Sequence, residues 1–160
     1  MTPEARIGHM DRALAEARAA ASRGEVPVGA VVVGLDGAVL AAAGNRTREL
    51  ADPTGHAEML AIRSACALLR SERLVGCDLY VTLEPCPMCA AAISFARVRR
   101  LYYGASDPKS GGIEQGPRVY THATCHHTPE IYAGIAETES ALLLKTFFAG
   151  RRGQSYHGVD

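Results

Sequence analysis

The sequence of 160 residues lacks an excess of charge of either sign, since 17 lysines and arginines face 17 aspartates and glutamates. Without net charge there is no global positive field to draw the chain onto nucleic acid, so any such binding must depend on local groups. The longest apolar runs have the length of a strand and are far shorter than a membrane span. Residues 1–20 are charged throughout and lack the apolar core of a signal peptide. We therefore expect a cytoplasmic protein that does not contact a membrane.

Internal repeats, low-complexity segments and linker-like runs are also missing from the sequence. With 48% hydrophobic residues the chain can bury one sizeable core, so we expect a single domain over residues 1–160. The five cysteines are an odd number in a chain without an export signal. Metal binding or catalysis is therefore a better interpretation of these cysteines than a disulfide framework.

Hydrophobic periodicity predicts alternating helices and strands along the chain. The turn residues Asp36-Gly37 predict a hairpin between the first two strands. The expected order is helix 4–22, strands 26–34 and 38–44, helix 56–70, strand 78–84, helix 87–96, strand 99–104, strand 130–135 and helix 137–150. This alternation indicates an α/β protein with a mostly parallel sheet and helices on both faces. In such proteins ligands bind where the carboxyl ends of strands meet helix N-termini.

Four residues suited to metal and proton chemistry fall at two of these junctions: His56, Glu58, Cys86 and Cys89. The two cysteines are about 60° apart around a helix, and a helix N-terminus favours their thiolate form. His56 and Glu58 are about 200° apart in a regular helix, so they can face one target only beyond its end. We infer that two helix N-termini converge on one point.

The histidine and the two cysteines offer three protein ligands to a metal. A structural zinc site normally has four protein ligands, whereas a catalytic zinc site keeps one position open for water. Glu58 would then stand beside the metal as a proton carrier. A thioredoxin-like redox pair and a helix-capping histidine with a surface glutamate are the structural alternatives. The combination of the two motifs favours a hydrolytic zinc site.

The motifs HAE (56–58) and EPCPMC (84–89) resemble the His-x-Glu…Pro-Cys-x-x-Cys signature of zinc-dependent nucleobase deaminases. Over most of residues 1–112 the chain is similar to the tRNA adenosine deaminases within that group. The similar segments, in the same order and at the same spacing, are GEVPVGAVVV (24–33), GNRTRE (44–49), DPTGHAE (52–58), LYVTLEPCPMCAAAI (79–93) and YYGASDPKSGG (102–112). The resemblance implies a three-layer α/β/α cytidine-deaminase-like fold with a central five-stranded mixed sheet.

The resemblance also implies an activity, which is hydrolytic deamination of the wobble adenosine of a tRNA anticodon loop to inosine, with release of ammonia. It implies one Zn²⁺ per chain held by His56, Cys86 and Cys89, with Glu58 as the catalytic residue. The implied partners are a tRNA anticodon stem-loop and a second copy of the chain in a homodimer. Two alternatives stay open. One is a guanine, cytosine or nucleoside deaminase of the same superfamily, in which EPCPMC also occurs. The other is a non-catalytic zinc-binding partner subunit.

Substrate contacts carry over onto matching positions of this sequence. Asn45 matches an asparagine that contacts the target nucleotide, and Asp107 matches an aspartate that contacts a neighbouring ribose. Further candidates are phosphate contacts from Lys109, Arg151 and Arg152 and a base contact from Phe148. Each has a structural alternative, namely a strand end for Asn45, an Asp-Pro turn for Asp107, a solvated surface for the three cations and a core position for one of the two adjacent phenylalanines.

Segment 113–130 fits the family pattern poorly. It contains His122, Cys125, His126 and His127, but adjacent histidines in a loop rarely converge on one ion, so we expect no second zinc there. The connection 105–128 is long for a loop without secondary structure. We therefore expect it to be functional or to contain a short helix.

Overall fold

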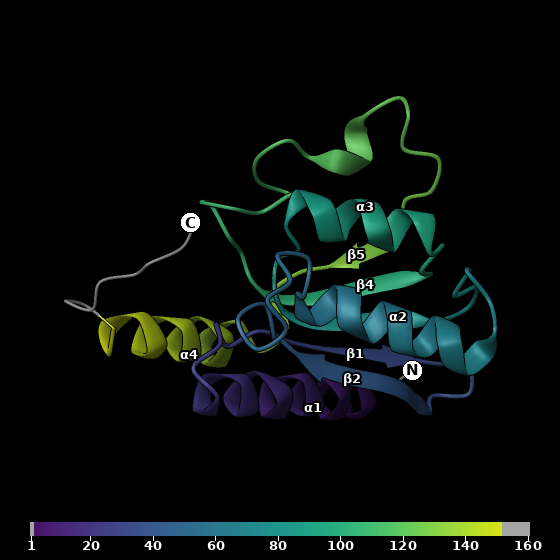
Figure 1. Cartoon of the computed structure of the whole chain (residues 1–160). Coiled ribbons are helices and arrows are strands. Elements are labelled where there is room, and N and C mark those ends of the chain that lie inside the picture. The colour runs from purple at the N-terminus through teal and green to yellow at the C-terminus, as the bar shows by residue number, and fades with distance from the viewer. Residues whose placement is uncertain (1, 152–160) are drawn as a thin grey trace.

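The computed structural model describes residues 2–151, and every expected helix and strand is present in it (Figure 1). In chain order the elements are α1 (Pro3–Ser22), β1 (Gly29–Val33), β2 (Val39–Gly44), α2 (Ala57–Leu69), β3 (Asp78–Leu83), α3 (Pro87–Phe95), β4 (Arg100–Ala105), the 3₁₀ helix η1 (Val119–Thr121), β5 (Glu130–Tyr132) and α4 (Glu137–Ala149). The short helix expected within the long connection 105–128 is η1.

The five strands form one mixed sheet in the order β2-β1-β3-β4-β5. Strands β3, β4 and β5 are parallel, whereas β1 is antiparallel to both β2 and β3. The mixed sheet is confirmed, and the expectation of a mostly parallel sheet is wrong for the half that contains β1. The turn at Gly37 (φ 85°) pairs β1 with β2 as expected, but it is β1 and not β2 that pairs with β3, which makes this third pairing antiparallel.

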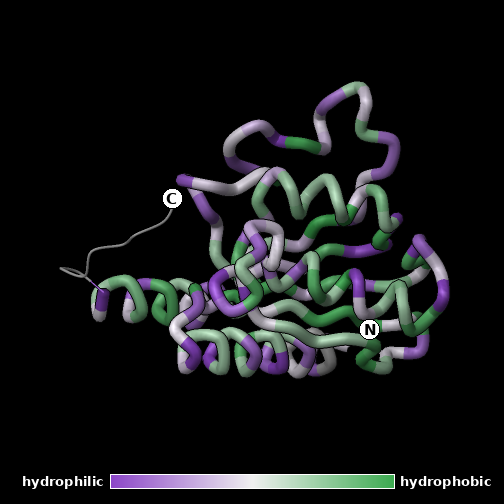
Figure 2. The backbone as a smooth tube through the Cα atoms, in the orientation of Figure 1, coloured by the Kyte–Doolittle hydropathy of each residue, from purple (hydrophilic) through white to green (hydrophobic). Residues whose placement is uncertain are grey.

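Helices cover both faces of the sheet, which gives three layers (Figure 1). On one face α2 and α3 bury apolar side chains such as Ala61 and Ile93 against the strands. On the other face α1 packs Met10 and Leu14 against the strands, and α4 lies beside it. Helix α1 approaches so closely that a Cβ at Gly29 would overlap the carbonyl of Ala13. Figure 2 shows hydrophobic colour along the strands and α3, and hydrophilic colour in the connecting loops.

The carboxyl ends of β2, β3 and β4 and the N-termini of α2 and α3 lie at the same edge of the sheet, and α4 extends beyond that edge (Figure 1). This is the arrangement that gathers residues from distant parts of the chain into one site. Within residues 2–151, no helix combines the length and the hydropathy that crossing a membrane would require.

Candidate metal and catalytic site

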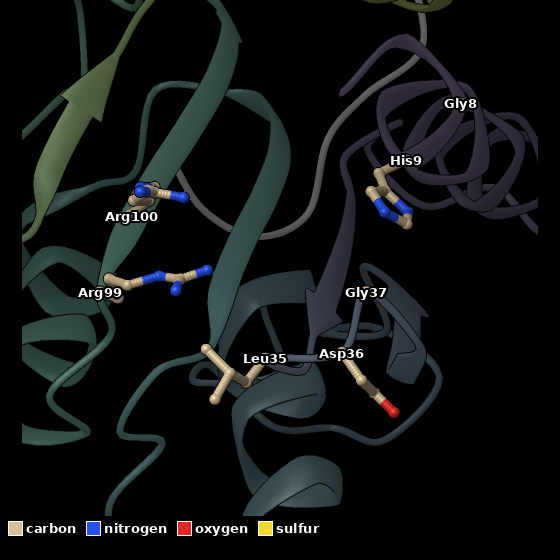
Figure 3. A pocket seen from close by; sticks show the side chains of 7 residues that line it. All are labelled: Gly8, His9, Leu35, Asp36, Gly37, Arg99 and Arg100. Carbon is tan, nitrogen blue, oxygen red and sulfur yellow. The ribbon is translucent and has the colours of Figure 1, made fainter. Parts of the chain in front are cut away.

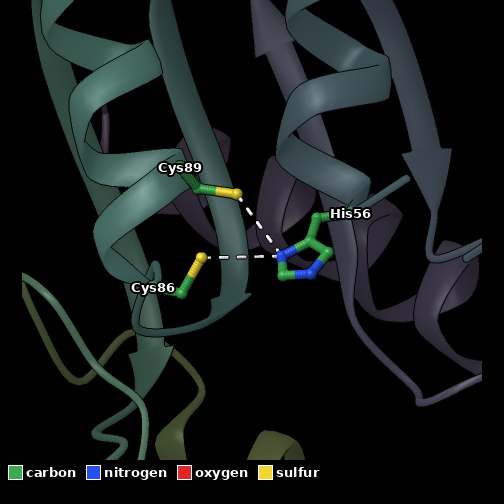
Figure 4. A group of neighbouring side chains, drawn as sticks. All are labelled: His56, Cys86 and Cys89. Carbon is green, nitrogen blue, oxygen red and sulfur yellow. Dashed lines mark hydrogen bonds between the residues drawn. The ribbon is translucent and has the colours of Figure 1, made fainter. Parts of the chain in front are cut away.

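Three donor atoms converge where α2 and α3 begin. His56 is the N-cap residue of α2 and Cys86 is the N-cap residue of α3, while Cys89 lies in the first turn of α3. Figure 4 shows the imidazole of His56 pointing between the two thiols, with Nδ1 3.6 Å from Sγ of Cys86 and 3.5 Å from Sγ of Cys89. All three donor atoms lie within 4.8 Å of one another. The inferred convergence of two helix N-termini on one point is thus found, and these three residues could hold a metal ion.

The electrostatics of these donors are strongly coupled. Hydrogen bonding with Cys89, together with that to His56, outweighs burial and lowers the pKa of Cys86 to about 4. The hydrogen bond with Cys86 and burial raise the pKa of Cys89. The hydrogen bond with Cys86 also raises the pKa of His56 despite its partial burial. Without a cation, therefore, one thiolate is stabilised while the second thiol keeps its proton, and a bound cation would favour ionisation of both.

Glu58 lies in the first turn of α2 and is buried, with 4% of its surface exposed. Burial raises the pKa of its carboxyl group, because a desolvated carboxylate is disfavoured relative to the neutral acid. Its neighbours include His56 and Cys89, both of which influence its ionisation. A buried carboxyl group with a raised pKa beside a metal-ligand cluster is suited to accept a proton and return it.

Asn45 directly follows β2 and has a structural function that the sequence did not reveal. Its Oδ1 accepts a hydrogen bond of 2.8 Å from the backbone N–H of Ala57, the first residue of α2. His56 occupies the N-cap position without making a side-chain capping bond, so Asn45 satisfies a helix donor from outside the helix. Within the described part of the chain Nδ2 of Asn45 has no hydrogen-bond partner. Asn45 therefore holds the start of α2 next to His56 and keeps a donor available.

Two buried glutamates hold the loops on either side of the cluster, and sequence reasoning missed both. Glu25 accepts the backbone N–H groups of Arg48 and Glu49 at 3.0 and 3.2 Å. Glu84, with 2% exposed, accepts five hydrogen bonds from segment 106–115. Although burial acts to raise the pKa of Glu84, these N–H donors outweigh it and the pKa is lowered. For Glu84 the available signal was its place directly after the buried strand β3, in a position that an apolar core would disfavour.

Segment 106–115 carries two of the candidate substrate residues. Oδ1 of Asp107 accepts the backbone N–H groups of Lys109 and Ser110 at 3.2 and 3.0 Å, which is the turn that the structural alternative described. Asp107 is half-buried and Lys109 is exposed. The turn therefore accounts for one carboxylate oxygen of Asp107 and is compatible with a ligand contact through the other.

At the end of α4 the two phenylalanines differ in environment. Phe147 is half-buried beneath the guanidinium of Arg151, whose Cζ lies 4.2 Å from the ring centroid. Phe148 packs edge-on against Phe147 and is 49% exposed. The inward-facing member of the pair is thus Phe147, and Phe148 presents a ring to solvent. Arg152, the remaining candidate, lies outside the described residues.

The residues of 122–127 are engaged separately and do not gather around one point. Nε2 of His122 is 2.7 Å from the carbonyl of Pro117, and Nε2 of His127 is 2.6 Å from the carbonyl of Val98. Cys125 lies 3.5 Å from the hydroxyl of Ser94. Across residues 2–151 the only cluster of at least three potential metal ligands is that of His56, Cys86 and Cys89.

A cavity of about 570 Å³ lies at the opposite end of the sheet, between α1, the β1–β2 hairpin and the start of β4 (Figure 3). Its two arginines are already paired, Arg99 with the buried Asp78 at 2.9 Å and Arg100 with Glu130 at 3.0 Å. None of the metal-ligand candidates lines this cavity.

Known proteins resemble this chain in sequence and in fold. The family described as the cytidine and deoxycytidylate deaminase zinc-binding region matches residues 3–105. The tRNA-specific adenosine deaminase of Agrobacterium fabrum is 62% identical over 147 residues, which cover 92% of this chain and 96% of that protein. A solved structure from work on A-to-I editing by tRNA:A34 deaminases at the wobble position of transfer RNA is 63% identical. It superposes with a TM-score of 0.84 and covers 86% of this chain and 99% of that one. The guanine deaminase of Bacillus subtilis is 31% identical with a TM-score of 0.64, covering 100% of this chain and 99% of that chain.

The fold, the three convergent donors and the matched region are those of a zinc-binding nucleobase deaminase. Within that class, the extent of identity separates the relatives: 62% to a tRNA-specific adenosine deaminase against 31% to a guanine deaminase. The chain belongs to the tRNA-specific adenosine deaminases.

Proposed function

We propose that this protein deaminates the wobble adenosine of a tRNA anticodon loop to inosine, consuming one water and releasing one ammonia. The observation that carries this proposal is the convergence of His56, Cys86 and Cys89 beside the buried Glu58, in a chain 62% identical to a tRNA-specific adenosine deaminase. Such a site supplies an activated water and a proton carrier, which are the two requirements of hydrolytic deamination.

We propose one zinc ion per chain, bound by the three convergent donors. With Zn–S about 2.3 Å and Zn–N about 2.0 Å, two tetrahedral ligands are separated by about 3.6 Å. The separations of Nδ1 of His56 from the two sulfur atoms, 3.6 and 3.5 Å, fit that value. Three protein ligands leave the fourth position open, as in catalytic zinc sites. Zinc bound there would lower the pKa of a water to about 7 and so supply a nucleophile at neutral pH.

Glu58 is the group that we propose to move protons. Its carboxylate takes a proton from the attacking water and passes it to the ring nitrogen next to the carbon under attack. It then takes the second proton from the hydroxyl group now bound to that carbon and delivers it to the departing amine, which leaves as ammonia as the carbonyl forms. Burial supports this function, because the raised pKa brings the carboxyl group closer to neutral pH, where it can both accept and donate.

Other residues are proposed to bind the RNA. Nδ2 of Asn45 can donate to the target nucleotide, because only its Oδ1 is used by α2. Asp107 can accept a ribose 2′-hydroxyl, which would distinguish RNA from DNA. Lys109 and Arg151 are local positive groups on a chain of zero net charge, and Phe148 exposes a ring for stacking. Arg152 is proposed as a further phosphate contact.

We also propose that residues 1–160 act as one cytoplasmic domain and that two copies form a homodimer. Phe95, the last residue of α3, is 76% exposed. This exposure supports a contact with a second copy, since large apolar side chains on a surface often lie at interfaces. Light scattering coupled to gel filtration would measure the mass in solution, and a mass of about one chain at micromolar concentration would contradict the homodimer.

The substrate class is tested by ammonia release from four compounds offered separately: an anticodon stem-loop with adenosine at the wobble position, free adenosine, guanine and cytosine. We expect release only from the stem-loop, with inosine at the wobble position of the product. A matched stem-loop with guanosine at that position serves as the control. Release from guanine alone would establish the first alternative, for which the guanine deaminase of matching length is the supporting observation. No release from any compound by zinc-loaded protein would favour the non-catalytic subunit.

A further inference from the structure

The carboxylate of Glu84 is the centre of a hydrogen-bond network that the metal cluster does not use. Oε1 accepts the hydroxyl of Ser106 at 3.2 Å and the backbone N–H of Asp107 at 3.0 Å. Oε2 accepts three consecutive backbone N–H groups at 3.0 to 3.1 Å, those of Ile113, Glu114 and Gln115. Both ends of segment 106–115 are therefore tied to one side chain.

The network connects this segment to the metal ligand Cys86. Glu84 stands two residues before Cys86, and the residue between them, Pro85, accepts the backbone N–H of Gly112 at 2.8 Å. The segment thus folds around residues 84–86 and has no regular secondary structure of its own. Its position relative to Cys86 depends on the carboxylate and on this backbone bond.

Two glycines allow the segment to approach so closely. A Cβ at Gly111 would lie 2.5 Å from Oε2 of Glu84, and a Cβ at Gly112 would lie 2.6 Å from the backbone nitrogen of Pro87. Neither glycine has the positive φ that would itself demand glycine. Glycine is therefore needed at positions 111 and 112 because a side chain would not fit beside the Glu84 carboxylate or the N-terminus of α3.

A buried carboxylate is costly unless its charge is matched by donors, and here the donors are the N–H and O–H groups of the segment. Among the ion pairs of residues 2–151, none involves Glu84. Scaffolding alone does not need a buried charge, since an apolar side chain of the same size fills the same space at lower desolvation cost. Together with the burial of Ile113 in the core, the hydrogen bonds to this charge hold the segment in the conformation seen here.

We propose that Glu84 is a positioning residue for substrate: it fixes the loop that carries Asp107 and Lys109 at a set distance from Cys86, so that the RNA flanking the target base is bound in register with the metal. This inference rests on the proposed function, because it concerns the RNA contacts of that site. It predicts that damage at Glu84 weakens use of the RNA substrate while leaving the metal bound.

Two variants disturb the network in different ways. In Glu84→Gln the amide oxygen can still accept the three N–H groups of 113–115, but the amide NH₂ then faces the N–H of Asp107, donor against donor. In Gly111→Ala the carboxylate is unchanged, but the new Cβ would lie 2.5 Å from Oε2 of Glu84 and 2.6 Å from the backbone carbonyl of Asp107, so it disturbs both the three N–H contacts of Oε2 and the turn at Asp107. Gly8→Ala is the matched control, because a Cβ there meets nothing within 4 Å.

The experiment measures kcat and KM for the wobble-adenosine stem-loop, zinc content, and amide hydrogen exchange of the zinc-loaded protein. We expect KM to rise about ten- to hundredfold in Glu84→Gln and in Gly111→Ala, since misplacing a substrate-positioning group by about 1 Å has effects of that size. Zinc content should stay at one per chain. Exchange should quicken at Asp107 in Glu84→Gln and at 113–115 in Gly111→Ala, with no change in Gly8→Ala.

An unchanged KM in both variants would overturn the inference, and so would a loss of zinc together with activity, which would make Glu84 a support of Cys86. If the unaltered protein fails to deaminate the stem-loop, the proposed function fails. The exchange pattern then still decides whether Glu84 holds the loop, so the two failures are distinguishable. Should Glu84→Gln not fold, Gly111→Ala with its intact carboxylate provides the same three measurements.

Discussion

Asn45 is predicted to have two separable functions, one for each atom of its side-chain amide. Its Oδ1 accepts the N–H of Ala57, a fully buried residue at the start of α2, and its Nδ2 is the proposed donor to the target nucleotide. Asn45→Ala removes both atoms, whereas Asn45→Asp keeps an acceptor for Ala57 and removes the donor. The two variants therefore separate stability from substrate binding.

The magnitude follows from the bond that is lost. An unsatisfied buried N–H costs about 1–3 kcal/mol, and loss of an N-terminal helix cap costs about 0.5–2 kcal/mol. We expect Asn45→Ala to lose about 1–2 kcal/mol, which for a domain of this size lowers Tm by about 2–8 °C. Asn45→Asp should lose less, because a carboxylate can accept the same N–H and is favoured at a helix N-terminus.

The two variants, which differ in stability, should both lose kcat/KM for the stem-loop. Loss of one neutral hydrogen bond to substrate costs about 0.5–1.5 kcal/mol and so lowers kcat/KM by a factor between about 2 and about 13. This loss of kcat/KM should appear in Asn45→Asp as well as in Asn45→Ala. Thermal unfolding of zinc-loaded protein and stem-loop kinetics are the two assays. Full kcat/KM in Asn45→Asp would exclude Nδ2 as a substrate donor. An equal loss of Tm in both variants would refute the capping function of Oδ1.

Further predictions concern the metal, the proton carrier, the RNA and the buried thiols. Cys86→Ala should lose its zinc in elemental analysis, and full occupancy would disprove the ligand set. Glu58→Ala should keep zinc and RNA binding but lose turnover by at least about 10²–10⁴, since it removes the general acid–base; near-normal turnover would assign the protons to another group. Lys109→Ala and Arg151→Ala should each flatten the slope of log Kd against log salt by about 0.7, the value for one phosphate contact to a single strand; an unaltered slope would remove that residue from the RNA contacts. Burial raises the pKa of Cys77, so at neutral pH it carries less thiolate than a free thiol and should react slowly with iodoacetamide, accelerating only at alkaline pH; fast labelling at pH 7 would contradict this burial.

Most of the fold could be predicted because its signals are local. The apolar spacing of α1 and the Asp36-Gly37 turn depend only on neighbouring residues, and both are found where the sequence indicated. The antiparallel pairing of β1 with β3 was missed, because the alternation of helices and strands does not say which of the two hairpin strands pairs with the rest of the sheet. The metal cluster was accessible from sequence for a geometric reason: residues 200° apart on one helix can share a target only at its end, which placed His56 and Glu58 at an N-terminus.

The hydrogen-bond networks around the cluster could not be predicted in the same way. Asn45 and Ala57 are 12 residues apart, and Glu84 and Gln115 are 31 residues apart, with no periodicity that relates them. The sequence does contain residues whose type is unexpected at their position in the local secondary structure. Glu84 follows a buried strand, and Gly111 lies in a segment without the positive φ that often explains glycine.

The buried glutamates also bear on how a chain with zero net charge can organise a site for an anionic substrate. The buried carboxylates of Glu25 and Glu84 each accept backbone N–H groups from a loop next to the metal cluster, and among residues 2–151 neither carboxylate is in an ion pair. Among residues 2–151 the exposed Lys109 is in no ion pair, so its charge is available for the phosphate contact that we propose. The negative charge of these two carboxylates is matched mainly by backbone dipoles, whereas the buried carboxylate of Asp78 is matched by the guanidinium of Arg99. Composition alone could not distinguish this arrangement from an evenly neutral surface, since the two have the same net charge and differ only in where each charge lies.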